Sequence, residues 1–312
     1  RMSGGRYDLW DLKFDITNIR DDVSIGGSFD MNDSNKKFIM PDIAPGETRE
    51  VVIPKNKIDS IADLGVFDAD VNLSTGEKME IKMDNGLLVA QYAKTKPKID
   101  GRIDKGEYGA EMLKFRIDNS AQVYGAPQKW EGADDLSADG YINYDDDSVY
   151  VAMKVKDNVF RQINSADRMW NGDSLQVLFV FDGTKTGTEY CISIPNGETT
   201  AKVYRHMQED NNGGLGGETA TGLFEYAEAA VKNEGGYTTY EVRFPFDKIR
   251  WHYDETIDKP EPGQTMWFSV CINDDDGQDR KLWMEYGRKG SAIGSGSKKG
   301  DYASELMFLP KQ

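Results

Sequence analysis

The sequence is poor in the two residue types on which many enzymes and metal sites depend. Its 312 residues include only two cysteines, Cys191 and Cys271, and two histidines, His206 and His252. Two cysteines are too few for a disulfide framework or a four-cysteine zinc site. Two histidines leave little for histidine-based catalysis. The sequence leaves open whether Cys191 and Cys271 form one bridge or remain two buried thiols.

Basic residues and long apolar runs are also scarce. Lys and Arg number 38 against 54 Asp and Glu, so the formal net charge at pH 7 is −16. Such an acidic balance disfavours nucleic acid and anionic membranes as partners. The densest apolar run, residues 175–181, has the length of a strand and is far shorter than the ~20 residues of a membrane span. We therefore expect no nucleic-acid partner and no membrane span.

What the sequence does contain is a series of short apolar segments separated by turn residues. Clusters of Asp, Asn and Gly bound most of them, as at residues 145–147 and 274–277. Many short strands with turn signals between them are typical of β-sandwiches. The predicted strands are residues 7–16, 48–53, 78–83, 148–155, 174–181, 189–194, 237–244 and 266–272.

A polar segment that contains a proline, residues 92–98, marks the expected domain boundary. Residues 1–93 are enough for a small immunoglobulin-like sandwich that serves as a spacer or accessory domain. Residues 94–312 have the size of one larger sandwich. The predicted fold class is therefore all-β, with two β-sandwich domains.

Alternation in the predicted strands of the second domain gives each strand an apolar and a polar side. Gln176, Cys191 and Asn273 fall on polar sides, and Arg243 does so in the strand 237–244. These sides form either a solvated outer surface or a sugar-binding face, in which aromatic rings cover the C–H side of a sugar and polar groups bind its hydroxyls. Among the six tryptophans, Trp170 stands in a loop, which favours a ligand role. The others are expected to pack: Trp10, Trp130, Trp251, Trp267 and Trp283.

Six ordered blocks between residues 98 and 310 resemble a family 9 carbohydrate-binding module. The opening is Pro97-Lys98-Ile99-Asp100-Gly101, and the most recognisable block is Trp170-Asn171-Gly172-Asp173-Ser174 with Phe181-Asp182. The remaining blocks are 130–138 with 149–157, 236–245, 273–276 and 306–310. The resemblance implies a non-catalytic glycan-binding sandwich, often specific for chain ends, that contains calcium.

The resemblance also implies a context and a ligand. Such modules are usually attached to secreted hydrolases of plant cell-wall polysaccharides. We therefore expect a secreted, extracellular or cell-surface protein of bacterial origin, with a catalytic domain on the same polypeptide. The expected ligand is a polysaccharide or oligosaccharide of the xylan, glucan or mannan type.

Carried over to this sequence, the resemblance implies that Trp170 stacks on the sugar and that Gln176 bonds its hydroxyls. The predicted carbohydrate-binding set is completed by Asp173, Asn273, Arg243 and Tyr286. Two positions depart from the family. Cys191 stands where an arginine contact is found, and the loop 286–302 lacks a second stacking tryptophan. Tyr286 or Tyr302 is the expected substitute for that tryptophan.

Aspartates in turns supply the hard oxygen ligands that calcium prefers. With the resemblance, Asp100, Asp135 and Asp275 become the predicted ligands of a structural calcium ion. Three other functions stay open at this point: a haem-binding electron-transfer domain, with axial ligands from the two histidines or 12 methionines; a hydrolase in its own right; and a structural spacer whose sugar site has decayed. Colour of the purified protein and product release from polysaccharides discriminate the first two.

Overall fold

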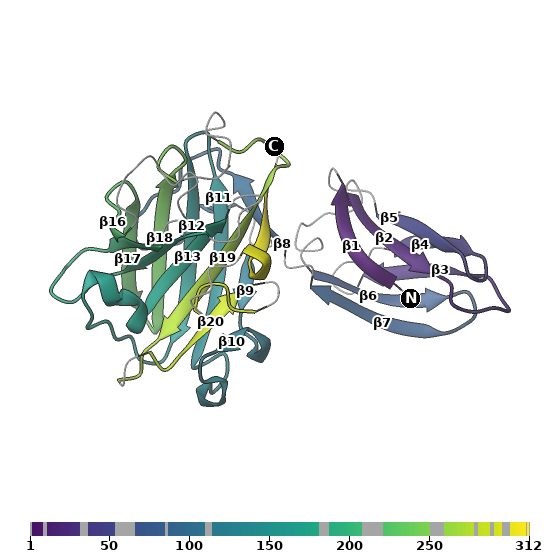
Figure 1. Cartoon of the computed structure of the whole chain (residues 1–312), viewed down its shortest axis with the longest axis horizontal. Helices are drawn as coiled ribbons and strands as arrows, with labels where there is room; N and C mark the ends of the chain where they lie inside the picture. Colours follow the sequence, from purple (N-terminus) through teal and green to yellow (C-terminus); the bar gives the residue numbers. More distant parts are fainter. Residues whose placement is uncertain are drawn as a thin grey trace. The chain divides into compact units, whose positions relative to one another are not determined.

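The computed structural model describes residues 2–8, 11–31, 37–53, 66–84, 87–109, 114–180, 187–207, 221–249, 259–277, 280–287, 290–294, 300–309 and 311. The chain divides into two compact units, Arg1–Leu87 and Leu88–Gln312. Strands dominate both units (Figure 1), which confirms the predicted all-β fold class. The division lies a few residues before the expected boundary because β8 (Leu87–Tyr92) pairs with β11 (Leu136–Tyr144) of the second unit.

The first unit contains a three-stranded sheet, β1-β2-β5, and a four-stranded sheet, β4-β3-β6-β7. Buried apolar residues come from both sheets, Ile16 and Val51 from one and Phe29 and Val71 from the other. The segment predicted as one strand over residues 7–16 is instead an antiparallel hairpin of two strands. The strands are β1 (Met2–Asp8), β2 (Asp11–Thr17), β3 (Ile25–Met31), β4 (Lys37–Ile43), β5 (Thr48–Ile53), β6 (Val66–Leu73) and β7 (Lys78–Asp84).

The second unit is one folded sheet whose strand order runs β16-β15-β14-β13-β19-β21-β8-β11-β12-β18-β17. The short strands β10 and β20 extend the β19 half, and β9 pairs with β11. Besides β8 and β11, its strands are β9 (Phe115–Ile117), β10 (Val123–Tyr124), β12 (Ser148–Asp157), β13 (Ser174–Val180), β14 (Thr188–Ser193), β15 (Lys202–Met207), β16 (Gly222–Leu223), β17 (Glu228–Glu234), β18 (Tyr237–Pro245), β19 (Thr265–Asp274), β20 (Leu282–Tyr286) and β21 (Ser304–Phe308). Short 3-10 turns are η3 (Ser120–Gln122), η4 (Pro127–Lys129), η5 (Ala166–Asn171) and η6 (Gly300–Tyr302).

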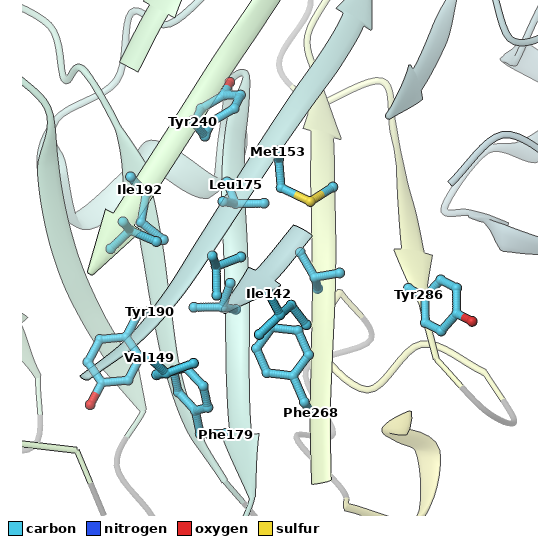
Figure 2. Close-up of a cluster of buried hydrophobic side chains, with 14 of the residues drawn as sticks. Ile142, Val149, Met153, Leu175, Phe179, Tyr190, Ile192, Tyr240, Phe268 and Tyr286 are labelled. Carbon is cyan, nitrogen blue, oxygen red and sulfur yellow. The ribbon is translucent and has the colours of Figure 1, made fainter. Parts of the chain in front are cut away.

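The core of the second unit lies between two halves of this sheet. Leu175 and Phe179 of β13 and Phe268 of β19 come from one half, and Val149 and Met153 of β12 come from the other (Figure 2). Burial of these apolar faces removes them from water, which is the main favourable contribution to folding. Because side chains alternate along a strand, the same packing turns the intervening residues of each strand outward. In the part of the chain that the structure describes, no helix is long and apolar enough to span a membrane.

Candidate functional site

The outward side of β13, β14 and β19 carries a hydrogen-bonded set of amides and acids, here called the polar face. The Asn273 side-chain nitrogen donates to Ser174 Oγ at 3.0 Å and to Gln176 Oε1 at 2.8 Å. The Gln176 nitrogen in turn donates to Glu189 of β14. Gln176, Glu189 and Asn273 are all nearly fully buried. The structure thus brings the predicted Gln176 and Asn273 together and adds Glu189, which the sequence analysis missed.

Two tryptophans and an arginine lie at the end of the polar face. Buried Met169 anchors the turn η5, so that the neighbouring Trp170 remains half-buried. The Arg280 guanidinium carbon lies 5.1 Å from the centre of the Trp170 ring and 4.2 Å from that of Trp283. Arg280 also donates to Asn273 Oδ1 at 3.2 Å. Burial lowers the pKa of the Arg280 guanidinium, against the opposing effect of Glu189 and other groups nearby.

Trp283, expected to be a packing residue, does pack, on the outward side of β20: it lies against an apolar cluster that includes Cys271 and stacks on Tyr124, with ring centres 6.4 Å apart. Its indole nitrogen donates to Ser291 Oγ at 3.1 Å. Glu285, also facing outward, accepts from Ser291 Oγ at 2.6 Å and from the backbone nitrogen of Ala292 at 2.7 Å, so it holds this loop against the strand. Leu282, Met284 and Tyr286 alternate toward the core, and this alternation is the sequence signal that places Trp283 on the outward side of β20.

Tyr286 and Arg243, both predicted to bind sugar, lie away from the polar face. Tyr286 belongs to the core cluster (Figure 2). Its ring meets that of Phe115 edge-on, with ring centres 5.3 Å apart. Arg243 stands on β18, in the other half of the sheet, where its Nε donates to Ser148 Oγ at 2.9 Å. Alternation along β20 and the topology of β18 correct these two expectations. Tyr302, the other substitute considered, packs against the same outward apolar cluster as Trp283.

The two cysteines are free buried thiols. Both have the polar-side parity expected of them, and both lie directly opposite Gln176, Cys191 on β14 and Cys271 on β19. Because β13 separates their strands, their Cα atoms are roughly 10 Å apart, beyond the ~7 Å limit for a disulfide. The structure therefore settles the open question against a bridge.

Five aspartates converge beside the polar face and form what we call the acidic cluster. Carboxylate oxygens of Asp157, Asp173 and Asp274 lie within 4.8 Å of one another, and those of Asp135, Asp274 and Asp276 form a second group of the same kind. Asp173, predicted to bind sugar, belongs here instead. Its oxygens accept from the backbone nitrogens of residues 161 and 275.

Of the three predicted calcium ligands, only Asp135 lies in the acidic cluster. Asp275 is adjacent to it and pairs with Arg161. Asp100 is elsewhere, with an exposed side chain, in a turn whose backbone donates to buried Glu241. The sequence analysis missed Asp157, Asp274 and Asp276 as members of this cluster. The signal for the first two was their position at the last residue of a strand.

The acidic cluster carries more negative charge than the ammonium group of Lys281 compensates. Burial raises the pKa of Asp274 to about 7, although Lys281 opposes this, and burial with mutual repulsion also raises the pKa of Asp157 and Asp173. The Lys281 ammonium lies 2.9 Å from Asp135 and 2.6 Å from Asp276. It lies 3.5 Å from Asp274 Oδ2, a buried oxygen that has no hydrogen-bond partner. This donor set fits a hard divalent cation.

Comparison with known proteins identifies the family. The family model described as carbohydrate family 9 binding domain-like matches residues 99–292. Two similar solved structures are family 9 carbohydrate-binding modules from Caldicellulosiruptor kristjanssonii. The one in complex with glucose is 18% identical, with 72% of this chain and 97% of that chain covered and a TM-score of 0.49. The one in complex with cellotriose is 16% identical, with 72% and 95% covered and a TM-score of 0.47.

No curated protein matches the sequence. The match at residues 99–292 covers more than half of the 312 residues and includes η5, the polar face and the acidic cluster. The chain belongs to the carbohydrate family 9 binding domain-like family.

Proposed function

We propose that the polar face of the second unit binds a neutral polysaccharide of the glucan, xylan or mannan type, without catalysis. The observation that carries this proposal is the contact of Trp170 and Trp283 with Arg280 beside the amides of Gln176 and Asn273. Indole rings cover the apolar C–H side of a sugar ring, and planar amide and guanidinium groups bond its hydroxyls.

Arg280 supplies the guanidinium group that Cys191 cannot provide. Where the family has an arginine contact, this chain has a buried thiol. The Arg280 guanidinium reaches the same face from the segment between β19 and β20 and donates to Asn273. Its planar fork of donors suits adjacent hydroxyls of one sugar.

Calorimetry with cellotriose, xylotriose and mannotriose tests the proposal. We expect wild-type protein to bind at least one of them and Trp170→Ala to lose about tenfold or more in affinity. Tyr237→Ala is the matched control, because Tyr237 is an exposed ring on β18, in the other half of the sheet. If none of the sugars binds, the proposal fails, and the unit is better explained as a structural spacer.

We further propose that the acidic cluster holds a structural calcium ion. Asp157, Asp173, Asp274 and Asp135 offer buried hard oxygens, with Asp276 at the rim. Bound calcium would supply the positive charge that Lys281 alone does not. It would also tie the ends of β12 and β19 to the segment before β13, since these carry Asp157, Asp274 and Asp173 respectively.

Thermal unfolding in calcium and in chelator tests the metal proposal. Calcium should raise the melting temperature of wild-type protein, because an ion that binds only the folded state stabilises it. Asp274→Asn should abolish this effect. Asp100→Asn should retain it, because the Asp100 side chain is exposed and outside the cluster. A melting temperature indifferent to calcium would contradict the proposal.

We propose that the chain is a secreted, accessory segment of a polysaccharide-degrading enzyme, attached to its catalytic domain, with the first unit as an immunoglobulin-like spacer. The family supports the accessory role, and the three-stranded and four-stranded sheets of the first unit support the spacer. Antibody raised against this chain should detect it in the culture medium of the producing bacterium, on a polypeptide that degrades polysaccharide. Detection only in cell extracts would contradict secretion.

A further inference from the structure

A cavity of about 520 Å³ lies on the second unit, separate from the polar face and the acidic cluster. Its wall on one side is formed by Gln91 and Tyr92 of β8 and Asn143 of β11. On the other side it is formed by the segment 93–109, which carries four lysines. It shares no residue with the polar face on β13, β14 and β19, or with Trp170, Arg280 and Trp283 at the end of that face. We call it the lysine cavity.

The segment that walls the cavity is fastened in place by contacts within the unit. The Glu107 carboxylate accepts from the backbone nitrogens of Lys98 and Asp104, at 2.9 and 3.0 Å. The Asn143 side-chain nitrogen donates to the backbone oxygen of Tyr108 at 3.1 Å. At Gly109, φ is +87° and a Cβ would lie 1.8 Å from Gln91 Oε1, so only glycine fits there. The cavity is therefore preformed.

The charge on the cavity wall contrasts with the rest of this acidic chain. Lys94, Lys98 and Lys105 line the cavity, and among the described residues none of them forms an ion pair. The fourth lysine, Lys96, is paired with Asp147 at 3.0 Å. The wall also carries the carboxylates of Asp104 and Glu107, and that of Glu107 accepts from backbone donors. With four lysines against these two acids, the concave site keeps an excess of positive charge, which raises the local concentration of anions.

We propose that the lysine cavity binds a carboxylate-bearing sugar, a hexuronate residue of an acidic oligosaccharide. This inference rests on the proposed carbohydrate function of the unit. The volume lies in the usual range for small-molecule sites and exceeds what a single inorganic oxyanion fills. Ammonium groups of the wall pair with the carboxylate of the sugar through charge-assisted hydrogen bonds.

A second site of this kind would broaden what the module selects. A neutral backbone at the polar face and an acidic substituent at the lysine cavity would be recognised by one unit. Where both sites engage one polymer, the second binding event is intramolecular and benefits from a high effective concentration. Polysaccharides with uronate substituents would then bind more tightly than their neutral counterparts.

The test uses calorimetry on the full chain with trigalacturonate as the acidic probe and cellotriose as the neutral one. Lys98→Gln/Lys105→Gln should lower trigalacturonate affinity by about tenfold or more and leave cellotriose affinity unchanged. Lys78→Gln/Lys129→Gln is the matched control, with the same charge change at exposed lysines outside the cavity. Trp170→Ala should lose cellotriose and retain trigalacturonate. Both lysine pairs are exposed, so the melting temperature should not change.

Four results would overturn the inference: wild-type protein that does not bind trigalacturonate, equal losses in the two lysine variants, loss of trigalacturonate with Trp170→Ala, or displacement of trigalacturonate by an equal concentration of inorganic phosphate. The last would show a general anion site. If cellotriose binds while trigalacturonate does not, the lysine cavity proposal fails and the proposed function stands. If cellotriose, xylotriose and mannotriose all fail, it is the proposed function that fails.

Discussion

Removal of divalent metal should make the second unit less stable as the pH rises from about 5 to about 8. Burial raises the pKa of Asp274 from 3.8 to about 7. The metal-free folded state therefore retains a proton on Asp274 that the unfolded chain has already released. Because the folded state binds more protons in this window, stability is highest at low pH and falls as the pH rises through the folded pKa. Asp157 and Asp173, whose pKa is also raised, act in the same direction.

The expected size follows from the Asp274 shift alone. Between about pH 5, where the unfolded carboxyl is already ionised, and the folded pKa of about 7, the loss is about 1.4 kcal/mol per pH unit, or about 3 kcal/mol of unfolding free energy in total. For a unit of this length that is a fall of roughly 8 °C in melting temperature. Calcium should remove most of the fall, because the ion replaces the proton as the compensating charge and binds best to ionised ligands.

Differential scanning calorimetry on metal-free protein, at about pH 5 and about pH 8, measures the effect. Asp274→Asn should weaken the pH dependence and leave the part that comes from Asp157 and Asp173, whereas Asp100→Asn should leave the whole of it unchanged. A wild-type melting temperature that rises over this range, or an equal response from the two variants, would refute the reasoning.

Three other changes have expected outcomes. Arg280→Ala should weaken glycan binding by about tenfold, measured by calorimetry, because it removes a donor beside Asn273; unchanged affinity would exclude Arg280 from the site. Glu285→Ala should lower the urea-derived unfolding free energy by about 3 kcal/mol, because it removes the buried carboxylate that accepts from Ser269, Ser291 and the backbone nitrogen of Ala292; an effect below about 1 kcal/mol would show that these donors find other acceptors. Native protein should resist thiol alkylation, whereas urea should expose both cysteines, Cys191 and Cys271, as counted by mass spectrometry; a non-reactive pair in urea would indicate a bridge.

Alternation along single strands was enough to predict part of the polar face. Gln176 and Asn273 were assigned to polar sides, and the structure joins them by a hydrogen bond. The same alternation was correct for Arg243 on β18, whose neighbours Val242 and Phe244 are in the core. Alternation, however, shows only which side of its own strand a residue occupies. Which half of the folded sheet holds β18 depends on long-range pairing, and no local pattern reports that.

The acidic cluster was harder to predict because its members come from separate parts of the chain. Asp157, Asp173 and Asp274 lie at or beside the ends of strands that are distant in sequence. Asp275 lies in the same run of three aspartates as Asp274 and Asp276, yet its side chain pairs with Arg161 instead of joining the acidic cluster. Tyr286 shows the opposite case, in which the local pattern is informative. Its alternation with Leu282 and Met284 indicates a core position, whereas the family resemblance assigned it to the sugar site.

The order of strands in the second unit also has a mechanical consequence. β8, the first strand, and β21, the last, are hydrogen-bonded neighbours, and the Leu309 nitrogen donates to the Ala90 oxygen at 2.9 Å beside them. A pull on the two ends of the unit would be resisted at this seam, where the chain enters and leaves. Gln176 and Glu189 stand on β13 and β14, which pair with neither β8 nor β21. A unit built this way would oppose a pull on its two ends at the seam before the strands β13 and β14 are strained.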